Sequence, residues 1–488
     1  MAPSTELPRG PAIGSLLLLL LLAMVVAARL FANVTSVAAT SGLSRLSDVP
    51  PTAADLPPAP GGAVGGADVP VRQPAGSPPL ALLPAPPSPL PVPRAAAIPS
   101  SIGGRVVAEG TGLPVSQAFV SAGEETVQTD ADGWFTLSAI PDTPTVHVVA
   151  AGYHVLRDHS LRDGDVLALT TFVARAIYLP YEQQWDPNSL AWAVQLARDG
   201  KINALVVDIK EEGGGVLPLV ATDAVRSLGA VVDPGTDVER FLDELQELGV
   251  YRIARVVTFL DRRFVLAFPD DAIRTAHGGV LDDGTYAWAD PSSPWAQAYN
   301  LAIGERAAAV FDEVQFDYVR FPGNSALALR DEKSGSERSA AITEFAATAS
   351  ARLHRHGAAL SFATFGVTTV IQEDGGIGQV LEDLAPYLDY YAPMLYPSTW
   401  PLGSLGWAYP AAHPGAVVSH TTAMAVDRAE AWSTMRIRPW LQDFTDYGTE
   451  GLRYGPSEVF AQIRGAREAG ASGFMLWDPS LNYALSGG

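Results

Sequence analysis

The region from residue 176 to the end of the sequence alternates short apolar stretches with segments of helical periodicity. The apolar stretches are rich in β-branched and aromatic residues, which predicts strands. Eight strands are expected, at 176–181, 204–209, 252–259, 313–318, 359–365, 389–396, 436–441 and 473–477. Helices are expected between them, for example at 189–198, 238–248, 336–356 and 457–469. This alternation predicts an α/β fold, a (β/α)₈ TIM barrel.

A doubly wound sheet is the alternative fold for alternating strands and helices. Such folds often bind a nucleotide through a glycine-rich loop. No Gly-x-Gly-x-x-Gly follows the first expected strand, and the sequence contains no Walker loop. We therefore favour the barrel, in which the active site forms at the C-terminal ends of the strands.

The expected strand at 313–318 has two contrasting faces. Its even-numbered residues are apolar or aromatic, whereas Glu313, Gln315 and Asp317 would point the other way. Pro322 ends the run, because proline has no N–H to give to a sheet. A strand with a carboxylate and amide face is poor core material unless its end opens into a polar site. We therefore expect Asp317 in the active site, with Glu313 near the opposite end of the barrel.

Residues 101–175 have a different pattern, with short strands expected at 104–108, 118–121, 134–137 and 145–149. Turn residues separate them, which predicts a small antiparallel β-sandwich. Asp130 and Asp132 fit a hairpin turn, because the further oxygen ligands of a calcium loop are missing. Gly-Arg-Val-Val at 104–107, Thr-Asp-Ala-Asp-Gly-Trp-Phe-Thr-Leu at 129–137 and Ala-Gly-Tyr at 151–153 resemble the carboxypeptidase-regulatory-like domain, which is usually an accessory module.

The N-terminal region predicts attachment to a membrane. Residues 1–12 are polar, and 13–32 are apolar apart from Arg29, close to the roughly 20 residues that span a bilayer. We expect a short cytoplasmic N-terminus and a single-pass signal-anchor, with the folded domains extracytoplasmic. A cleaved signal peptide and secretion is the alternative. The Pro/Ala/Gly-rich residues 33–100 predict a disordered linker between the membrane and the folded part.

Charge and composition exclude several kinds of protein. The net charge of −21 argues against nucleic acid as a partner, because phosphate binding needs clustered Lys and Arg. The absence of cysteine excludes disulfides, thiolate metal sites and a cysteine nucleophile. No Gly-x-Ser-x-Gly elbow is present, which argues against a serine hydrolase. No cofactor and no metal are expected.

The ends of the expected strands carry the residues that suit carbohydrate chemistry. Glycoside hydrolysis needs two carboxyl groups, one to protonate the leaving oxygen and one to attack or to activate water. We expect Asp317 to be the nucleophile or base, because a neighbouring Arg320 would favour its charged form. The acid should be a second carboxyl with a raised pKa, and the candidates are Asp208, Glu373 and Asp374. Aromatic faces and polar groups for the sugar are expected from Lys210, Tyr318, Arg320, Tyr396, Trp440, Gln442 and Trp477.

Several long motifs in this region resemble one family. They are Phe-Asp-Glu-Val-Gln-Phe-Asp-Tyr-Val-Arg-Phe-Pro at 311–322, Asp-Tyr-Tyr-Ala-Pro-Met-Leu-Tyr-Pro-Ser at 389–398, Arg-Pro-Trp-Leu-Gln-Asp-Phe at 438–444 and Gly-Phe-Met-Leu-Trp at 473–477. Together with Val-Asp-Ile-Lys at 207–210, they resemble the putative glycosyl hydrolase domain of unknown function 4015, over about residues 176–482. The resemblance implies a TIM barrel related to glycosidases. We expect this domain at residues 176–488.

The favoured interpretation is a membrane-anchored glycoside hydrolase that acts on a cell-surface or environmental polysaccharide. A glycan-binding wall protein without a working carboxyl pair is the alternative. The two differ in one distance: a second carboxyl at roughly 5–10 Å from Asp317 favours hydrolysis. A weaker third interpretation is a metal-dependent enzyme that uses Asp208 and Asp317 as oxygen ligands.

Overall fold

The computed structural model of the protein describes residues 101–138, 143–323, 329, 332–432, 435–446 and 451–487. The expected cytoplasmic N-terminus, apolar run and linker, at 1–12, 13–32 and 33–100, lie outside these residues. Within the described ranges, no helix is both long enough and apolar enough to cross a membrane. The membrane anchor therefore stays a prediction from the sequence.

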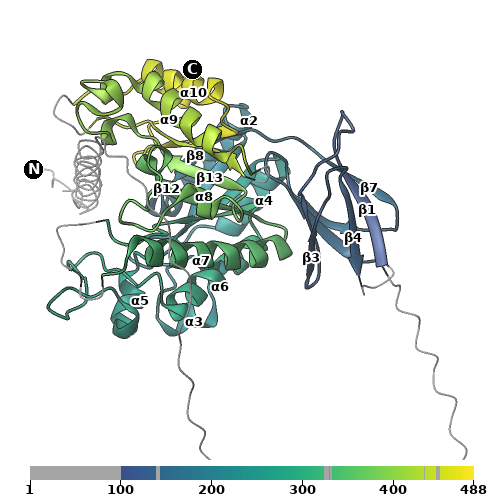
Figure 1. The fold of residues 1–488 in the computed structure, drawn as a ribbon, viewed down its shortest axis with the longest axis horizontal. Coiled ribbons are helices and arrows are strands. Elements are labelled where there is room, and N and C mark those ends of the chain that lie inside the picture. The colour runs from purple at the N-terminus through teal and green to yellow at the C-terminus, as the bar shows by residue number, and fades with distance from the viewer. Residues whose placement is uncertain are drawn as a thin grey trace, which may run out of the picture. The chain divides into compact units, whose positions relative to one another are not determined.

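Eight parallel strands close into a barrel, and Figure 1 shows it with its surrounding helices. They are β8 (Ala174–Leu179), β9 (Ala204–Lys210), β10 (Tyr251–Val257), β11 (Glu313–Asp317), β12 (Ala359–Phe365), β13 (Tyr390–Met394), β15 (Trp440–Gln442) and β16 (Gly473–Trp477). The order around the sheet is β12, β11, β10, β9, β8, β16, β15 and β13, and β13 pairs again with β12. This closure confirms the expected (β/α)₈ barrel and excludes the doubly wound sheet, which is open.

Two strand boundaries differ from expectation. The first strand lies at Ala174–Leu179, two residues earlier than the pattern indicated. The expected strand at 436–441 is divided into β14 (Arg436–Ile437) and β15. Pro439 lies at the break, where it has no N–H to donate to a neighbouring strand.

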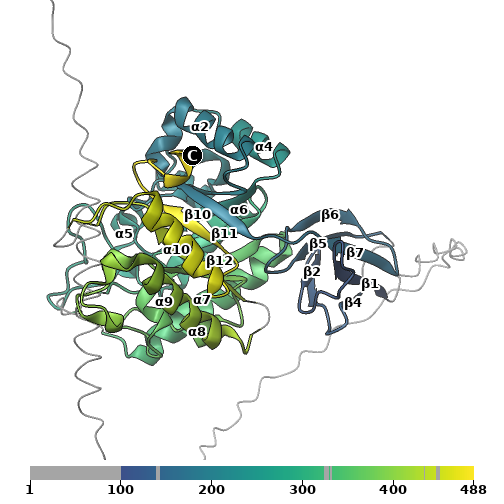
Figure 2. The same ribbon diagram turned by 90° about the horizontal axis from the view of Figure 1, so that it is seen from above.

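Helices surround the barrel strands (Figures 1 and 2). They are α2 (Pro187–Arg198), α3 (Asp223–Ser227), α4 (Val238–Glu247), α5 (Arg262–Ala267), α6 (Pro294–Ala308), α7 (Gly335–Arg355), α8 (Leu381–Leu384), α9 (Pro414–Ala429) and α10 (Pro456–Glu468). Single 3₁₀ turns lie at Tyr181–Trp185, Pro218–Val220, Pro269–Asp271, Gly366–Thr369, Pro397–Thr399, Ser404–Gly406, Pro410–Ala412 and Ala484–Gly487. The longest helix, α7, begins with a reciprocal capping box between Ser334 and Glu337.

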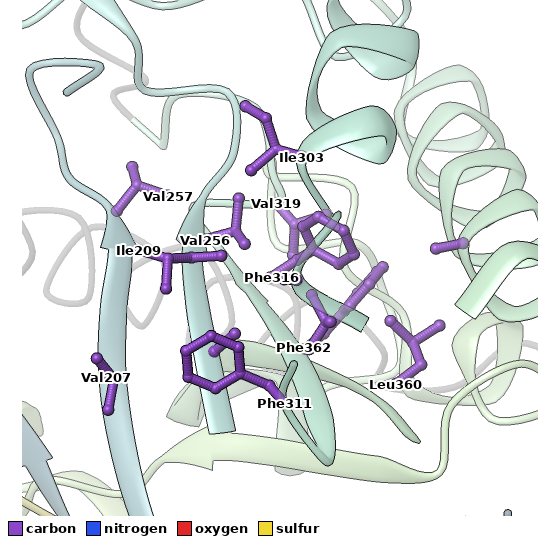
Figure 3. Packing of buried hydrophobic residues seen from close by; sticks show 14 of the residues in the cluster. Val207, Ile209, Val256, Val257, Ile303, Phe311, Phe316, Val319, Leu360 and Phe362 are labelled. Atoms are coloured by element: carbon purple, nitrogen blue, oxygen red, sulfur yellow. The ribbon is translucent and has the colours of Figure 1, made fainter. Parts of the chain in front are cut away.

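The main core lies between the outer face of the barrel and these helices. Val207 and Ile209 of β9, Val256 of β10 and Phe316 of β11 point outward and are fully buried (Figure 3). Ile303 of α6 packs in the same cluster. Alternate residues of each strand face this core, so the remaining residues face the barrel interior. The same alternation puts Glu313, Gln315 and Asp317 inside the barrel, as the sequence predicted.

A buried ion pair lies inside the barrel at the start of β11. Glu313 Oε1 accepts a hydrogen bond from Arg438 and another from Ser361 Oγ, at 2.5 Å. The side chains of Glu313 and Arg438 are both fully buried. The Arg438 guanidinium also lies 3.8 Å from the centre of the Tyr390 ring. Glu313 is the first residue of β11, so this pair lies at the N-terminal end of the barrel, as expected for Glu313.

The residues before the barrel form two small sheets around a common core. The strands are β1 (Ser101–Ala108), β2 (Phe119–Ala122), β3 (Glu125–Gln128), β4 (Trp134–Ser138), β5 (Thr145–Val149), β6 (Leu156–Ser160) and β7 (Asp165–Leu169). One sheet has the order β4–β1–β7 and the other β3–β2–β5–β6. The pairs are antiparallel except β1 with β7, so the expectation of a purely antiparallel sandwich is wrong at that pair. Membership of the carboxypeptidase-regulatory-like family stays a prediction.

Residues of these small sheets bond to the N-terminal ends of the barrel strands. Arg157 donates to the carbonyls of Phe311 and Gly357, which lie just before β11 and β12. The N–H of Gly152 donates to the hydroxyl of Tyr390, the first residue of β13, at 2.9 Å. These contacts therefore lie at the opposite end of the barrel from the C-terminal strand ends.

The buried ion pair gives a prediction for stability. The variant Arg438→Met leaves Glu313 as an uncompensated buried charge, which typically costs about 3–5 kcal/mol. We expect a loss of that size in the free energy of unfolding, measured by denaturant titration of the full chain. The double variant Glu313→Gln/Arg438→Met should recover most of the loss, because it leaves no unpaired charge. Unchanged stability of Arg438→Met contradicts the role of the pair.

Candidate active site

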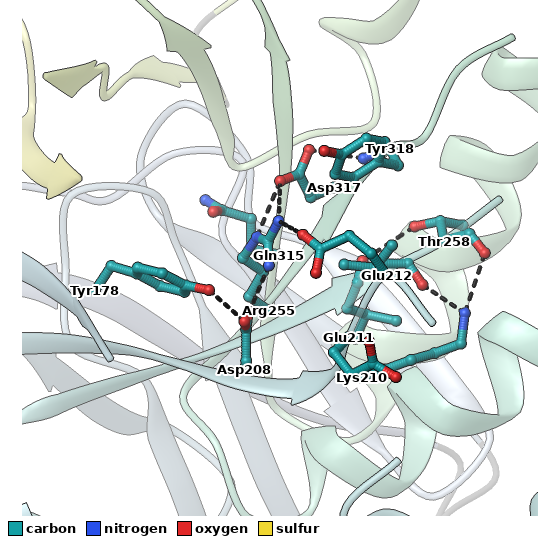
Figure 4. Close-up of polar contacts among 12 residues, drawn as sticks. Tyr178, Asp208, Lys210, Glu211, Glu212, Arg255, Thr258, Gln315, Asp317 and Tyr318 are labelled. Atoms are coloured by element: carbon teal, nitrogen blue, oxygen red, sulfur yellow. Dashed lines mark hydrogen bonds and ion pairs between the residues drawn. The ribbon is translucent and has the colours of Figure 1, made fainter. Parts of the chain in front are cut away.

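Arg255, in the middle of β10, joins three carboxyl groups inside the barrel (Figure 4). Its Nη1 donates to Asp208 Oδ1 at 2.7 Å. Its Nε and Nη2 both donate to Asp317 Oδ2, at 2.9 and 2.7 Å. Nη2 also donates to Glu212 Oε1 at 3.2 Å. One guanidinium therefore fixes three carboxyl groups through charge-assisted hydrogen bonds.

The register of three neighbouring strands brings these side chains together. Asp208 of β9 and Gln315 of β11 both pair with Arg255 of β10, one on each side. Asp317 is two residues beyond Gln315, so it faces the same side of the sheet. Asp317 is also the last residue of β11, and Glu212 follows the end of β9. The cluster thus lies towards the C-terminal ends of the strands, where TIM-barrel sites form.

Asp208 is the innermost of the three carboxyl groups, with 1% of the residue exposed. Its Oδ2 accepts a hydrogen bond from the Tyr178 hydroxyl of β8, so both of its oxygens have protein donors. Burial raises the pKa of Asp208 to about 7, although the positive charge of Arg255 opposes the shift. Burial and the charge of Asp208 raise the pKa of Tyr178 well above its usual value. Tyr178 therefore keeps its proton and acts as a donor.

Asp317 is held by three N–H donors and is 7% exposed. Besides the two bonds from Arg255 to Oδ2, its Oδ1 accepts from the backbone N–H of Tyr318 at 2.7 Å. A carboxylate has about four lone-pair positions, so about one stays available for another partner. Tyr318 has a φ of 49°, in the left-handed region that residues other than glycine rarely adopt. Local backbone strain of this kind is concentrated at functional sites.

Glu212 is the most accessible of the three carboxyl groups, with 24% of its side chain exposed against 10% for Asp317. The preceding residue, Glu211, fixes the loop after β9. Its two oxygens accept from the N–H groups of Gly213 and Gly215, at 2.5 and 2.6 Å. Glu211 therefore has a structural role in the loop, whereas Glu212 points to Arg255.

Aromatic rings enclose the cluster from one side. Trp477, at the end of β16, stacks on Tyr178 with a centroid distance of 4.2 Å and is partly exposed. The Arg255 guanidinium lies 5.3 Å from the Trp477 ring centre. Trp440 is 2% exposed, and its Nε1 donates to Gln315 Oε1 at 3.1 Å. Of the aromatic residues expected to meet a sugar, Trp477 is thus partly open, whereas Trp440 and Tyr396 (7% exposed) fill the barrel.

Lys210 is separated from the cluster by an irregularity in β9. Asp208 pairs with Arg255, but Lys210 pairs with Val256, so the register shifts between them. A one-residue shift moves a side chain to the other face of a sheet. Lys210 therefore points outward, where its Nζ lies 2.9 Å from Asp261 Oδ2 and is fully buried. The expectation that Lys210 meets substrate hydroxyls at the barrel mouth does not fit this position.

Arg320 was expected to pair with Asp317, but in the described part of the chain the ion pair of Asp317 is with Arg255. The Arg320 guanidinium lies 4.5 Å from the ring centre of Phe365 and 4.6 Å from that of Trp288. Burial lowers the pKa of Arg320 to about 10. Its Nη1 donates to the carbonyl of Phe321 at 3.0 Å. Arg320 thus contacts the loop after β11 and does not form the expected ion pair with Asp317.

Asp374 and Glu373, in the loop after β12, lack the buried, weakly charged setting that was expected for the acid. Asp374 forms two hydrogen bonds with Arg338 of α7, at 2.7 and 3.1 Å. Burial opposes the effect, but Arg338 lowers the pKa of Asp374 below its usual value. This direction is opposite to the raised pKa that was expected of the acid. Glu373 is exposed.

Gln442 is fully buried, and both ends of its amide are occupied. Its Oε1 accepts from the Ser398 hydroxyl and N–H, at 2.9 and 3.1 Å. Its Nε2 donates to the carbonyl of Phe444 at 3.0 Å. Gln442 thus joins the loops after β13 and β15 rather than presenting an amide at the barrel mouth.

Sequence reasoning missed Arg255, Tyr178 and Glu212 as parts of the site. Arg255 had a signal, because an arginine within an apolar stretch that continues into Val256 and Val257 is costly unless it is paired. Glu212 lies four residues after Asp208 in a loop, where no periodicity predicts which way it points. Tyr178 lies inside the expected strand 176–181, before its expected end, whereas the candidate residues came from the ends of strands.

The cluster suits acid–base chemistry better than metal binding. Arg255 occupies the space between Asp208 and Asp317 where a cation would have to bind both carboxylates. In the ranges that the structure describes, no group of three or more His, Asp and Glu residues is arranged to hold a metal ion. The carboxyl groups that share this guanidinium also differ in burial, from 1% exposed for Asp208 to 24% for the side chain of Glu212.

A comparison with solved structures finds several that are similar to part of this chain. A hypothetical protein from Ruminiclostridium thermocellum ATCC 27405 is 31% identical, covering 38% of this chain and 96% of its own, with a TM-score of 0.34. The PgaB (BpsB) glycoside hydrolase domain from Bordetella bronchiseptica is 15% identical, covering 63% and 94%, with a TM-score of 0.46. α-L-Fucosidase isoenzyme 2 from Paenibacillus thiaminolyticus is 13% identical, covering 64% and 48%, with a TM-score of 0.40. A search of curated proteins finds no match.

The family assignment rests on the sequence of the barrel. The sequence profile described as "Putative glycosyl hydrolase domain" (domain of unknown function 4015) matches residues 176–483. The match begins within β8 and continues through β16, so it includes every residue of the Arg255 cluster. The chain belongs to the putative glycosyl hydrolase domain family.

Proposed function

We propose that this protein is a glycoside hydrolase that cleaves O-glycosidic bonds of a cell-surface or environmental polysaccharide. The observation that carries the proposal is the cluster in which Arg255 holds Asp208, Asp317 and Glu212 near the C-terminal ends of the barrel strands. Glycosidases need two carboxyl groups a few ångströms apart, and membership of the family supports a carbohydrate substrate. The apolar run at 13–32 supports a membrane-anchored, extracytoplasmic enzyme.

The distance between carboxyl groups favours hydrolysis over a purely glycan-binding role. Asp317 Oδ2 and Glu212 Oε1 both contact Arg255 Nη2, at 2.7 and 3.2 Å. Their separation cannot exceed the sum of these distances, so a second carboxyl lies below the upper limit of roughly 10 Å for a working pair. The carboxyl pair that a binding protein would lack is therefore present.

Asp317 is proposed as the nucleophile or base. Its three N–H donors suit a carboxylate, which only accepts hydrogen bonds. Those donors also fix its orientation without filling every lone-pair position. The partly exposed Trp477 ring stands beside Arg255 and offers a flat apolar face for the C–H surface of a sugar.

Asp208 is proposed as a buried partner that fixes Arg255 rather than as a group that meets the sugar. Both of its oxygens are occupied, by Arg255 and Tyr178. Its pKa, raised to about 7, has a consequence for stability. A carboxyl whose pKa is higher in the folded state stabilises the fold fully below its unfolded pKa of 3.8, and this contribution is lost as the pH rises through about 7.

The variant Asp317→Asn tests the proposed nucleophile. Release of reducing ends from a polysaccharide panel by the full chain should fall by more than about 1,000-fold, because the amide cannot attack or deprotonate water. The variant should stay folded by circular dichroism but melt at a lower temperature, because its single amide oxygen cannot accept from both Arg255 and the Tyr318 N–H. Asp243→Asn, at an exposed position of α4, is the matched control and should keep full activity. Full activity of Asp317→Asn on a substrate that the wild type cleaves would remove Asp317 from the mechanism.

The variant Asp208→Asn tests the buried carboxyl through its pH dependence. The wild type should lose stability between about pH 4 and pH 7, as Asp208 in the folded state resists ionisation. Asn cannot ionise, so denaturant titrations at pH 5 and pH 8 should show a smaller loss in the variant. Burial also raises the pKa of Asp443 to about 7. Part of the pH dependence of stability should therefore remain in both proteins. Identical pH dependence in wild type and variant contradicts the assignment.

A further inference from the structure

We propose that Glu212 is the second catalytic carboxyl, which protonates the leaving oxygen and then activates water, in a reaction that retains the anomeric configuration. This inference rests on the proposed function and adds to it the identity of the proton donor. Sequence reasoning looked for that donor in Asp208, Glu373 and Asp374. The geometry around Arg255 points to a different residue, in the loop after β9.

The first argument is distance. Asp317 Oδ2 and Glu212 Oε1 share the donor Arg255 Nη2, at 2.7 and 3.2 Å. Their separation is therefore smaller than the roughly 6.5 Å at which the range for inverting glycosidases begins. Retaining enzymes hold their two carboxyl groups at about 5–5.5 Å, which leaves no room for a water between them and the sugar. The Arg255 geometry fits the retaining arrangement.

The second argument is access. A proton donor must reach the glycosidic oxygen, so it needs an oxygen that is open to the substrate. Glu212 has 24% of its side chain exposed. Among the described residues, its contact with Arg255 is an ion pair through Oε1 alone, which leaves Oε2 for the substrate. Asp208 is 1% exposed and uses both oxygens within the protein, so it cannot meet a sugar without losing Tyr178 or Arg255.

The charge of the cluster is unbalanced. Arg255 supplies one positive charge to three carboxyl groups. Asp317 takes two of its hydrogen bonds and matches that charge. Full ionisation of the other two would leave two uncompensated negative charges in a largely buried site, which is costly. Of those two carboxyl groups, Asp208 is 1% exposed, so only Glu212 is placed to exchange a proton with a substrate.

The loop around Glu212 is built to hold it in place. Glu211 bonds to the N–H groups of Gly213 and Gly215, so the chain turns tightly just after Glu212. Gly214 has a φ of 87°, and a Cβ there would lie 2.1 Å from Asp261 Oδ1, so only glycine fits. Asp261 in turn caps α5 through the N–H of Phe264, at 2.8 Å. The position of Glu212 is thus fixed by the scaffold rather than by an unsupported loop.

The two chemical steps follow from these positions. In the first, an oxygen of the Asp317 carboxylate bonds to the anomeric carbon. The bond from that carbon to the leaving oxygen breaks, and the leaving oxygen takes both its electron pair and the proton of Glu212. In the second, the Glu212 carboxylate takes a proton from water as the water oxygen bonds to the anomeric carbon. The bond to Asp317 breaks, and both carboxyl groups return to their first state.

The test compares leaving groups in the full chain. The probes are panels of 4-methylumbelliferyl and 2,4-dinitrophenyl glycosides, since dinitrophenolate departs without protonation. Glu212→Gln should lose at least about 100-fold in kcat/KM on the methylumbelliferyl probe, the usual size of general acid catalysis. Its loss in the first step with the dinitrophenyl probe should be below about 10-fold. For Glu212→Ala, added azide should speed turnover and give a glycosyl azide with the configuration of the substrate.

Three variants serve as controls. Glu182→Gln, at an exposed position of the 3₁₀ turn Tyr181–Trp185, should match the wild type. Asp208→Asn and Glu373→Gln should show no difference between the two leaving groups. Leaving-group dependence in either of them, with none in Glu212→Gln, would overturn the inference.

The anomeric configuration of the first product, read by proton NMR, gives a result that is independent of the variants. Retention is expected, and inversion would overturn the distance argument while leaving glycoside hydrolysis intact. Cleavage of no glycoside by the wild type would instead contradict the proposed function, and the inference with it. The two failures are therefore distinguishable.

Discussion

The candidate site depends on one guanidinium, that of Arg255. It is 1% exposed, and it places three carboxyl groups within hydrogen-bond distance of a single positive charge. Without that charge, the carboxyl groups would repel one another in a setting with little water to screen them. The stacked rings of Tyr178 and Trp477 lie on one side of it, each within about 6 Å, where the faces of aromatic rings attract cations. Arg255 thus organises both the acidic groups and the aromatic surface of the site.

The strands of the barrel position the partners of Arg255. Parallel strands in register put Asp208, Arg255 and Gln315 side by side, and alternation then puts Asp317 on the same face. At the other end of the barrel, Glu313 and Arg438 form a second buried ion pair under the Tyr390 ring. Trp440 and Gln315 bond to one another between the two ends. The interior that the structure describes is therefore a stack of polar pairs and aromatic rings, and the partly exposed Glu212 and Asp317 lie towards its C-terminal end.

The sequence predicted the fold and one half of the site. Period-two alternation was enough to place Asp317 inside the barrel, and the alternation of strands with helices was enough for the closed sheet. The predictions that were wrong concern residues whose positions depend on strand irregularities and long-range contacts, which the periodicity of the sequence does not reveal. The irregularity in β9 moves Lys210 to the outer face, although it lies only two residues from Asp208. The loop after β12 ties Asp374 to Arg338 of α7, a residue 36 positions away in the sequence. Likewise, the nearest arginine in the sequence, Arg320, stacks on rings, whereas the arginine on the next strand pairs with Asp317.

The most direct test of this account is to trap the proposed intermediate. The full chain would be inactivated with a 2-deoxy-2-fluoroglycosyl fluoride of a sugar that it accepts, and the labelled peptide sequenced by mass spectrometry. The fluorine slows both steps but the good leaving group speeds the first, so a covalent sugar accumulates on the nucleophile. The account predicts one label, on Asp317. A label on Asp208, Glu212 or another carboxyl, or steady turnover of the reagent with no label at all, would contradict it.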